Sequence, residues 1–210
     1  MIVDLNVSSV LDVGCGPGEL LLALAQVRPQ LRFTGVDLAP QVIAANARNL
    51  PGMKFQVLDL QDGPLDQRFD LVISSEVIEH LSDWRQGIRH LASMVAEGGY
   101  LAITVPTGRI YDTERHFGHV EHPTSDELVM VAMDQRLELL ELRNWGFPFY
   151  RFLKIVTNVE PDFALRAFGE GGYGPGKKFV SHFLYWLTFL GPKSSPAGCQ
   201  LFALFRRAAN

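Results

Sequence analysis

Histidines and carboxylates gather in the segment 107–123, where three of the chain's six histidines fall within seven residues. These histidines are His116, His119 and His122, and the acids beside them are Asp112, Glu114 and Glu121. An imidazole that titrates near neutral pH can accept a proton from a reacting group. The segment therefore predicts an acid–base site, and a surface loop with solvated histidines is the alternative for any single one.

A second group of the same residue types occurs at Glu76, Glu79 and His80. Spacings of three and four residues place these side chains on one face of a helical turn. Glutamate and histidine together can bind a divalent cation, and a histidine of segment 107–123 would then be the fourth ligand. The interpretation that we favour needs no metal, because acids are also stabilised at the positive N-terminal end of a helix.

A glycine turn near the N-terminus is the strongest binding motif. Gly14, Gly16 and Gly18 follow an apolar run, and an apolar helical pattern begins directly after them at 20–24. Glycine lets the main chain approach a ligand closely, and the free N–H groups of the next helix point toward that ligand. A dinucleotide fold needs G-x-G-x-x-G, but Glu19 occupies the third position, so a nicotinamide cofactor is disfavoured.

An acid about 20 residues beyond the turn ends a short apolar strand, at Asp37. A nucleotide fold places there the carboxylate that accepts hydrogen bonds from the ribose hydroxyls. The alternative is an N-cap for the helix that Pro40 begins. The glycine turn upstream favours the ribose role.

The spacing of the turn resembles the first motif of the class I S-adenosylmethionine-dependent methyltransferases, (hydrophobic)-(D/E)-x-G-x-G-x-G. Residues 11–18, L-D-V-G-C-G-P-G, match it at every position. The stretches F-D-L-V at 69–72 and G-G-Y-L-A-I-T-V-P at 98–106 are also similar to the family. E-V-I-E-H-L at 76–81 is typical of its small-molecule branch. The resemblance covers residues 7–143 and the last strand.

This resemblance implies a pocket for S-adenosylmethionine, with S-adenosylhomocysteine as the product. The adenine amino group would donate to Asp59, with Leu38 and Leu60 covering the ring, although a turn aspartate is the alternative for Asp59. The methionine half would lie at the carboxyl end of strand 69–74. The implied cofactor-binding residues are Asp12, Gly14, Cys15, Gly16, Gly18, Asp37, Leu38, Asp59, Leu60, Ser75 and Glu76.

In the family that the chain resembles, the loop after the fifth strand borders the acceptor pocket. His119 is the first candidate for a catalytic base, since G-H-V at 118–120 is similar to a frequent element of the family, and His122 is the second. The pattern E-x-x-E-H at 76–80 also occurs in RNA 2′-O-methyltransferases of small RNA ends, where it binds a metal. Some quinone-pathway O-methyltransferases carry it too, so a metal-assisted enzyme of either kind is an alternative.

Strand and helix patterns alternate with short connections along the first 106 residues, which indicates a parallel, doubly wound sheet. The predicted strands are 7–13, 31–37, 53–58, 69–74, 100–106, 137–142 and 201–205, and the predicted helices end near 27 or span 41–50 and 83–96, with another from 124. The fold class is therefore α/β. The resemblance implies a Rossmann-like seven-stranded, mostly parallel sheet with an antiparallel last strand.

Residues 145–199 separate the last two strands and depart from the family's usual short connection. Of the chain's 22 aromatic residues, 13 lie between Trp145 and Phe189, and helices are predicted at 149–157, 162–168 and 178–190 with a glycine-rich hinge at 169–176. We favour a lid over an apolar acceptor pocket. A homodimer face and peripheral membrane contact through 179–190 are the alternatives. A core of 1–144 and 200–210 and this helical insert then form one domain.

Charge and cysteine usage narrow the class of protein. The net charge of −4 argues against tight binding to nucleic acid. Residues 1–144 carry 11 basic and 20 acidic residues, a net −9, while 145–210 carry 8 and 3, a net +5. This asymmetry indicates two differently solvated faces, or a tail that meets an anionic substrate or surface. Two cysteines form no disulfide framework, and no signal-peptide or membrane-span pattern occurs, so we expect a cytoplasmic protein.

Together these patterns predict an enzyme that transfers a methyl group from S-adenosylmethionine to a small, fairly apolar acceptor, at oxygen. The sulfonium donor is already activated, so the protein chiefly positions the acceptor and excludes water. A non-catalytic S-adenosylmethionine-binding subunit, which supports another protein through residues 145–199, is the remaining alternative.

Overall fold

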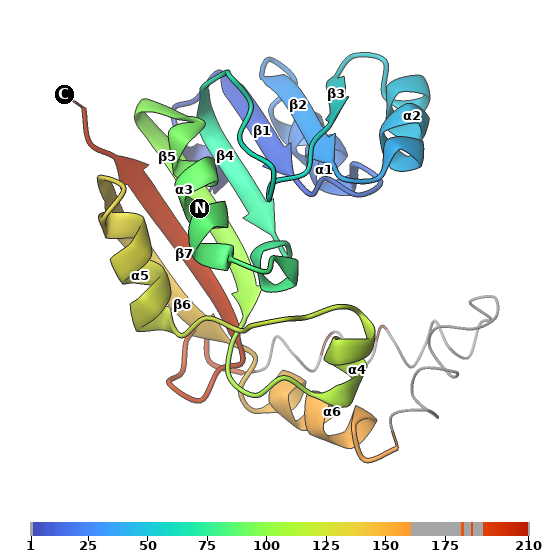
Figure 1. The fold of residues 1–210 in the computed structure, drawn as a ribbon, viewed down its shortest axis with the longest axis vertical. Coiled ribbons are helices and arrows are strands. Elements are labelled where there is room, and N and C mark those ends of the chain that lie inside the picture. The colour runs from blue at the N-terminus through green and yellow to red at the C-terminus, as the bar shows by residue number, and fades with distance from the viewer. Residues whose placement is uncertain (1, 161–181, 183–185, 187–190, 210) are drawn as a thin grey trace.

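The computed structural model describes residues 2–160, 182, 186 and 191–209, and one seven-stranded sheet forms its centre (Figure 1). The strands are β1 (Ser9–Val13), β2 (Arg32–Asp37), β3 (Lys54–Val57), β4 (Phe69–Ser75), β5 (Val95–Pro106), β6 (Leu137–Trp145) and β7 (Gln200–Arg207). Their order is β3-β2-β1-β4-β5-β7-β6, and β7 is antiparallel to both of its neighbours, whereas the pairs among β1 to β5 are parallel. The predicted fold class is therefore confirmed.

Helices cover both faces of this sheet. They are α1 (Glu19–Val27), α2 (Pro40–Asn49), α3 (Trp84–Ser93), α4 (Asp112–His116), α5 (Ser125–Met133) and α6 (Phe149–Thr157), with 3-10 turns η1 (Ile2–Asp4) and η2 (Ile78–His80). Trp84, Ile88 and Leu91 of α3 are fully buried in one core cluster with residues of α5. Leu21 and Leu24 of α1 belong to a second cluster. These are the apolar faces that the periodicity predicts.

Side-chain caps fix where α3 and α5 begin. The Asp83 carboxylate accepts a hydrogen bond from the Gln86 N–H over 3.0 Å at the start of α3. Thr124 and Glu127 form the predicted capping box: the Glu127 N–H donates to the Thr124 hydroxyl, and the Thr124 N–H donates to the Glu127 carboxylate. The box places the first turn of α5 directly after the histidine-rich segment.

Several predicted boundaries differ from the structure: β6 runs to Trp145 rather than to Leu142, and the largest differences lie between α3 and β5. The helix predicted at 83–96 ends at Ser93, and β5 begins at Val95 rather than at Tyr100. The reason is a bulge: Phe69 pairs with Val95 but Leu71 pairs with Tyr100, and Gly98 adopts a φ of 71° between them. The segment 107–123 is also less irregular than predicted, because it contains the short helix α4.

The insert is described only in part. Helix α6 spans 149–157 as predicted, and it lies with α4 beyond the carboxyl ends of the parallel strands (Figure 1). The helix predicted at 162–168, the hinge at 169–176 and nearly all of 178–190 fall outside the described residues, apart from the helical His182 and Trp186. The lid, the homodimer face and the membrane contact through 179–190 stay predictions, as does the division into core and insert. Within the described part of the chain, no helix has the length and apolar character of a membrane span.

Candidate active site

A cavity of about 320 Å³, here called the cofactor cavity, opens where β1, β2 and β4 end. It is lined by Val13, Gly14, Asp37, Leu38, Leu58, Asp59, Leu60, Gln61, Glu76, Val77, His80 and Leu81. Ligands of open α/β sheets bind at this edge, where neighbouring strands connect in opposite directions. The cavity thus brings together Gly14, Asp37, Leu38, Asp59, Leu60 and Glu76 from the predicted set. Asp12, Cys15, Gly16, Gly18 and Ser75 are not among its lining residues.

The glycine turn is attached to β2 by its own main chain. The N–H groups of Gly14 and Cys15 both donate to the carbonyl of Val36, over 2.8 and 2.9 Å. Gly14 has a φ of 73°, and a Cβ atom there would lie 2.3 Å from Cγ2 of Val77. Gly14 is therefore required for the close approach of the turn to Val77. Gly16 also has a positive φ, of 47°, but open space surrounds the position of its Cβ.

Asp37 is oriented by two main-chain donors. The Gly16 N–H donates to Oδ2 and the Ala39 N–H donates to Oδ1, each over 2.9 Å. A carboxylate oxygen can accept a second hydrogen bond, so both oxygens keep capacity for a ligand in the cavity. The N-cap residue of α2 is Ala39, which excludes the alternative that Asp37 caps this helix.

Asp12 and Cys15 are buried behind the turn. Asp12 is 3% exposed, and burial, with a further contribution from Asp37, raises the pKa of its carboxyl to about 7. Burial also raises the pKa of the Cys15 thiol to about 12, with Asp12 and Asp37 adding to the effect. A thiol with this pKa is not a nucleophile at neutral pH. Both side chains are therefore buried beneath the turn and do not line the cofactor cavity.

The residues predicted to hold the adenine line the same cavity as the turn. Oδ1 of Asp59 accepts a hydrogen bond from the Gln61 N–H over 2.8 Å, so this aspartate does shape a turn while it lines the cavity. Leu60 is buried, whereas Leu38 is 63% exposed. An exposed leucine beside a cavity is available to cover a flat ligand. Gln61 and Val77, which also line the cavity, were missed by the sequence analysis, although each directly follows a predicted residue.

Ser75 and Glu76 tie the ends of β4, β5 and β7 together. The Glu76 carboxylate accepts hydrogen bonds from the Thr104 hydroxyl, over 2.9 Å, and from the Gln200 amide, and Ser75 shares a 2.8 Å hydrogen bond with Thr104. Burial raises the pKa of Glu76, while the bonds from Thr104 and Gln200 oppose that rise. Glu76 has a φ of 56°. Residues other than glycine in the left-handed region cluster at functional sites.

The carboxylate of Glu79 is fully buried, and neither of its oxygens has a hydrogen-bond partner among the described residues. Nε2 of His80 lies 4.0 Å from Oε1 of Glu79, and the His80 and His119 rings meet edge to face with centroids 4.8 Å apart. Burial, followed by the charge of Glu76, raises the pKa of Glu79 to about 8. Glu79 lies in the first turn of the three-residue 3-10 helix η2, as the interpretation without a metal expects, whereas Glu76 precedes this turn.

His119 joins Glu79 and His80 to a second group. Its Nδ1 shares a 2.8 Å hydrogen bond with Nε2 of His122, and Glu114, His119 and His122 place ligand atoms within 4.8 Å of one another. The same limit holds for Glu79, His80 and His119. Burial, followed by His80 and His122, lowers the pKa of His119 to about 4. We call these five residues the histidine cluster. Both predicted catalytic histidines belong to it.

Two contacts fix the histidine cluster, one to η2 and one to α6. The N–H of Val120 donates to the carbonyl of Glu79 over 2.8 Å, which fixes the histidine-rich segment on η2. Lys154 of α6 forms a 2.6 Å ion pair with Glu114. Burial alone would raise the pKa of Glu114, but the hydrogen bonds from Lys154 and Tyr111 lower it. Because His80 also lines the cofactor cavity, the cluster borders that cavity.

The sheet order and the glycine turn at the cavity define the Rossmann-like fold of the class I methyltransferases. The chain matches the family described as "Methyltransferase domain" over residues 4–161, and it belongs to that family. This match confirms the predicted methyltransferase family.

Relatives and solved structures agree with this family. The chain is 35% identical over 101 residues to a trans-aconitate 2-methyltransferase of Escherichia coli O157:H7; the match covers 48% of this chain and 40% of that relative. A TehB-like SAM-dependent methyltransferase from Corynebacterium glutamicum has a TM-score of 0.63 at 18% identity, with 98% of this chain and 83% of that chain covered. The N-methyltransferase NodS of Bradyrhizobium japonicum, in complex with S-adenosyl-L-homocysteine, has a TM-score of 0.57 at 18% identity, with 96% and 78% covered. These structures share the fold.

Proposed function

We propose that this chain transfers the methyl group of S-adenosylmethionine to an oxygen of a small, fairly apolar molecule. The observation that carries the proposal is the meeting of two parts: the cofactor cavity with its oriented Asp37, and the histidine cluster at its border through His80. An apolar body of the acceptor is supported by the exposed apolar side chains of α6, which include Phe149, Phe152 and Ile155.

The cofactor is proposed to lie along the cavity as the sequence predicts. The Asp37 carboxylate accepts from the ribose hydroxyls, and Asp59 accepts from the adenine amino group, with Leu38 and Leu60 against the ring. The main chain of the glycine turn and the Glu76 carboxylate receive the methionine half, and Ser75 supports Glu76 through their shared partner Thr104. Negative charge at Glu76 suits a cationic ammonium group.

Methyl transfer from a sulfonium is an in-line displacement. The acceptor oxygen attacks the methyl carbon, the carbon–sulfur bond breaks, S-adenosylhomocysteine leaves, and the acceptor's proton passes to a base. His119 is the proposed base, with His122 beside it. Burial lowers the pKa of His119 to about 4 rather than leaving it near neutral pH, which keeps the imidazole unprotonated at pH 7 and also makes it a weaker base than a free imidazole. In the tautomer in which Nδ1 donates to His122, Nε2 of His119 keeps a lone pair for the proton.

Calorimetric titration of the purified chain with S-adenosylhomocysteine, beside NADH as control, tests the cofactor assignment. Binding of the first alone supports the proposal, and binding of neither overturns it. Transfer of label from methyl-labelled S-adenosylmethionine to a panel of hydroxyl compounds then tests the reaction. Activity of a stable monomer would count against the alternative of a non-catalytic supporting subunit.

A metal-assisted methyltransferase is the second candidate function, and one observation favours it. The Glu79 carboxylate is buried without a hydrogen-bond partner in the described structure, and His80 and His119 lie beside it. Buried charges are normally paired or bound to a metal. These three residues fit a divalent cation, with His122 or Glu114 close by. Such an ion lowers the pKa of a bound hydroxyl, as an acceptor at an RNA end or on a quinone precursor would require.

A further inference from the structure

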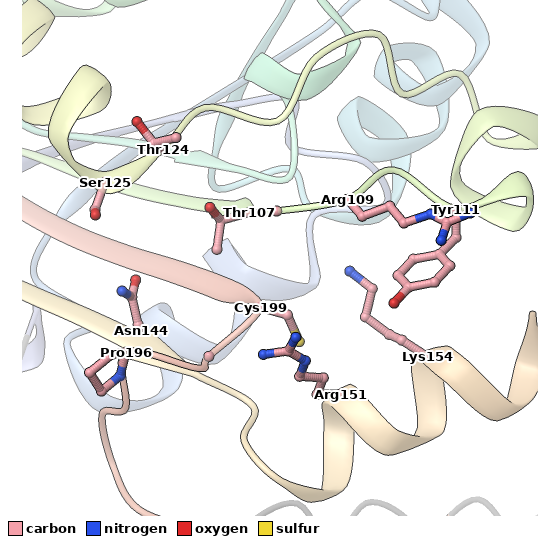
Figure 2. Close-up of a pocket in the computed structure, with 12 residues that line it drawn as sticks. Thr107, Arg109, Tyr111, Thr124, Ser125, Asn144, Arg151, Lys154, Pro196 and Cys199 are labelled. Carbon is pink, nitrogen blue, oxygen red and sulfur yellow. The ribbon is translucent and has the colours of Figure 1, made fainter.

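A second cavity, of about 300 Å³, lies beyond the carboxyl end of β5, and we call it the basic cavity (Figure 2). It is lined by Thr107, Gly108, Arg109, Tyr111, Thr124, Ser125, Asn144, Arg151, Lys154, Pro196, Gly198 and Cys199. Three of these side chains are cationic, several carry hydroxyl or amide groups, and no acid is among the lining residues that the structure describes. A cavity with this lining is suited to an anion.

The cationic side chains come from two separate segments. Arg109 belongs to the segment after β5, and its guanidinium lies over the Tyr111 ring, 5.4 Å from the centroid. Arg151, near the start of α6, and Lys154, in its last turn, project toward that segment (Figure 2). Nη1 of Arg151 donates to the carbonyl of Ala197 over 3.0 Å, which holds this side chain at the cavity wall. The three charges are therefore held in place before any ligand arrives.

Most of this positive charge is uncompensated. Lys154 is paired with Glu114, but no ion pair joins Arg109 or Arg151 to an acid of the described residues. Thr124 and Ser125, at the start of α5, add hydroxyl groups to the wall of the same cavity. Arg151 and Lys154 belong to residues 145–210, whose net positive charge indicated either a solvated face or a tail that meets an anion. Part of that charge therefore lies at a cavity.

The basic cavity is close to the proposed chemistry. Lys154 lines it and at the same time pairs with Glu114 of the histidine cluster, over 2.6 Å. The Thr107 N–H donates to the carbonyl of Cys199 over 3.1 Å, next to Gln200, which in turn donates to Glu76 of the cofactor cavity. One ion pair and one strand end therefore separate the basic cavity from both parts of the active site.

We propose that the basic cavity binds an anionic group of the methyl acceptor, a carboxylate or a phosphate. This inference rests on the proposed function and names the substrate class: a small molecule with a body that carries the hydroxyl and an anionic end held by Arg109, Arg151 and Lys154. Guanidinium groups bind such anions with paired N–H donors. The volume is at the lower end for ligand pockets, which suits one end of a small acceptor.

Calorimetric titrations with two probes test this inference, inorganic phosphate and benzoate, with benzamide as the uncharged control, all at constant ionic strength. We expect binding of at least one anion and none of benzamide. Phosphate alone would identify a phosphate acceptor, and benzoate alone a carboxylate acceptor. Arg109→Gln and Arg151→Gln should each weaken the anion about 10-fold or more, since each removes a charge-assisted hydrogen bond. Arg89→Gln is the matched control, because Arg89 is an exposed arginine of α3 that does not line the cavity.

Binding of neither anion, or equal binding by wild type and both arginine variants, would overturn the inference. Arg151→Gln removes the hydrogen bond from Arg151 to the Ala197 carbonyl, whereas Arg109→Gln leaves that bond intact. Thermal unfolding checks that both variants are folded. S-adenosylhomocysteine is titrated into the same samples and should bind equally in all four proteins. If it binds while the anions do not, only this inference fails; if the anions bind while it does not, the proposed function fails.

Discussion

The main-chain N–H of Gly16 donates to Oδ2 of Asp37 over 2.9 Å, across 21 residues of chain. The glycine turn and the end of β2 therefore position each other, and the Ala39 N–H holds the other oxygen of the same carboxylate. A carboxylate whose two oxygens are fixed in this way loses little conformational freedom when a ligand binds. The two motifs that the sequence shows separately thus form one preorganised wall of the cofactor cavity.

Replacing Asp37 tests that wall. Asp37→Ala should weaken S-adenosylhomocysteine about 10- to 100-fold, because it removes charged hydrogen bonds to the ribose. The affinity of Asp37→Asn should lie between those of Asp37→Ala and the wild type, since the side-chain oxygen of asparagine can still accept a hydrogen bond. Isothermal calorimetry measures the affinity, and circular dichroism checks the fold. Asp62→Ala, an exposed acid outside the cavity, is the control. Wild-type affinity in a folded Asp37→Ala protein would refute the ribose assignment.

Two alanine substitutions in the glycine turn separate strain from collision. Both Gly14 and Gly16 have a positive φ, which costs about 1–2 kcal/mol for a residue with a Cβ. Gly14→Ala also drives its methyl group to within 2.3 Å of Val77, whereas Gly16→Ala enters open space. Gly14→Ala should therefore lower the free energy of unfolding more than Gly16→Ala does, by urea titration. The added substitution Val77→Ala should recover part of the loss in Gly14→Ala and none in Gly16→Ala.

The parts of the site that the sequence predicts are those set by local pattern. The turn, Asp37 and the strand ends follow from glycine spacing and apolar periodicity, so Gly14, Asp37 and Asp59 could be placed together. Contacts between distant segments have no such signal. The approach of Val77 to Gly14 depends on how β1 and β4 pair. The placement of Arg109 and Arg151 at one cavity depends on how α6 packs beside the segment after β5. The bulge at Gly98 was missed because two glycines after a helical pattern also signal a helix end.

The buried carboxyl of Asp12 predicts a pH dependence of stability. Its pKa is about 7 in the folded protein against 3.8 as the ordinary value. The folded state therefore binds this proton more tightly, and the contribution to stability falls as the pH rises from about 4 to about 7. Asp12→Asn should remove this fall. Relative to wild type, the variant should gain on the order of a few kcal/mol in unfolding free energy between pH 4 and pH 7.

Asp70 supplies the contrast with the opposite sign. Burial alone would raise the pKa of its carboxyl, but hydrogen bonds from Ser8 and Ser9 lower it. Its contribution to stability is present above the ordinary pKa of an aspartate and is lost as the pH falls through the lowered value. Asp70→Asn should therefore cost more stability at pH 7 than at pH 3. Urea unfolding at several pH values gives the free energy of unfolding of both variants. If this free energy depends on pH in the same way for Asp12→Asn and wild type, the raised pKa of Asp12 is refuted.

The unpartnered carboxylate of Glu79 leads to a prediction that separates the two candidate functions. If Glu79, His80 and His119 hold a divalent cation, the chain should bind Mn²⁺, measured by loss of the free-ion signal in electron paramagnetic resonance. Glu79→Gln and His119→Ala should each weaken that binding at least 10-fold, because each removes a ligand. His116→Ala, an exposed histidine of α4 outside the cluster, should bind as wild type does.

The opposite outcome has an equally clear meaning. If the chain does not bind Mn²⁺ and His119→Ala abolishes methyl transfer, His119 is the base. The activity of this variant should then recover with added imidazole, which can replace the missing ring. Because rescue by imidazole needs a vacant ring position and not a metal ligand set, its combination with metal-independent activity would exclude the metal-assisted mechanism.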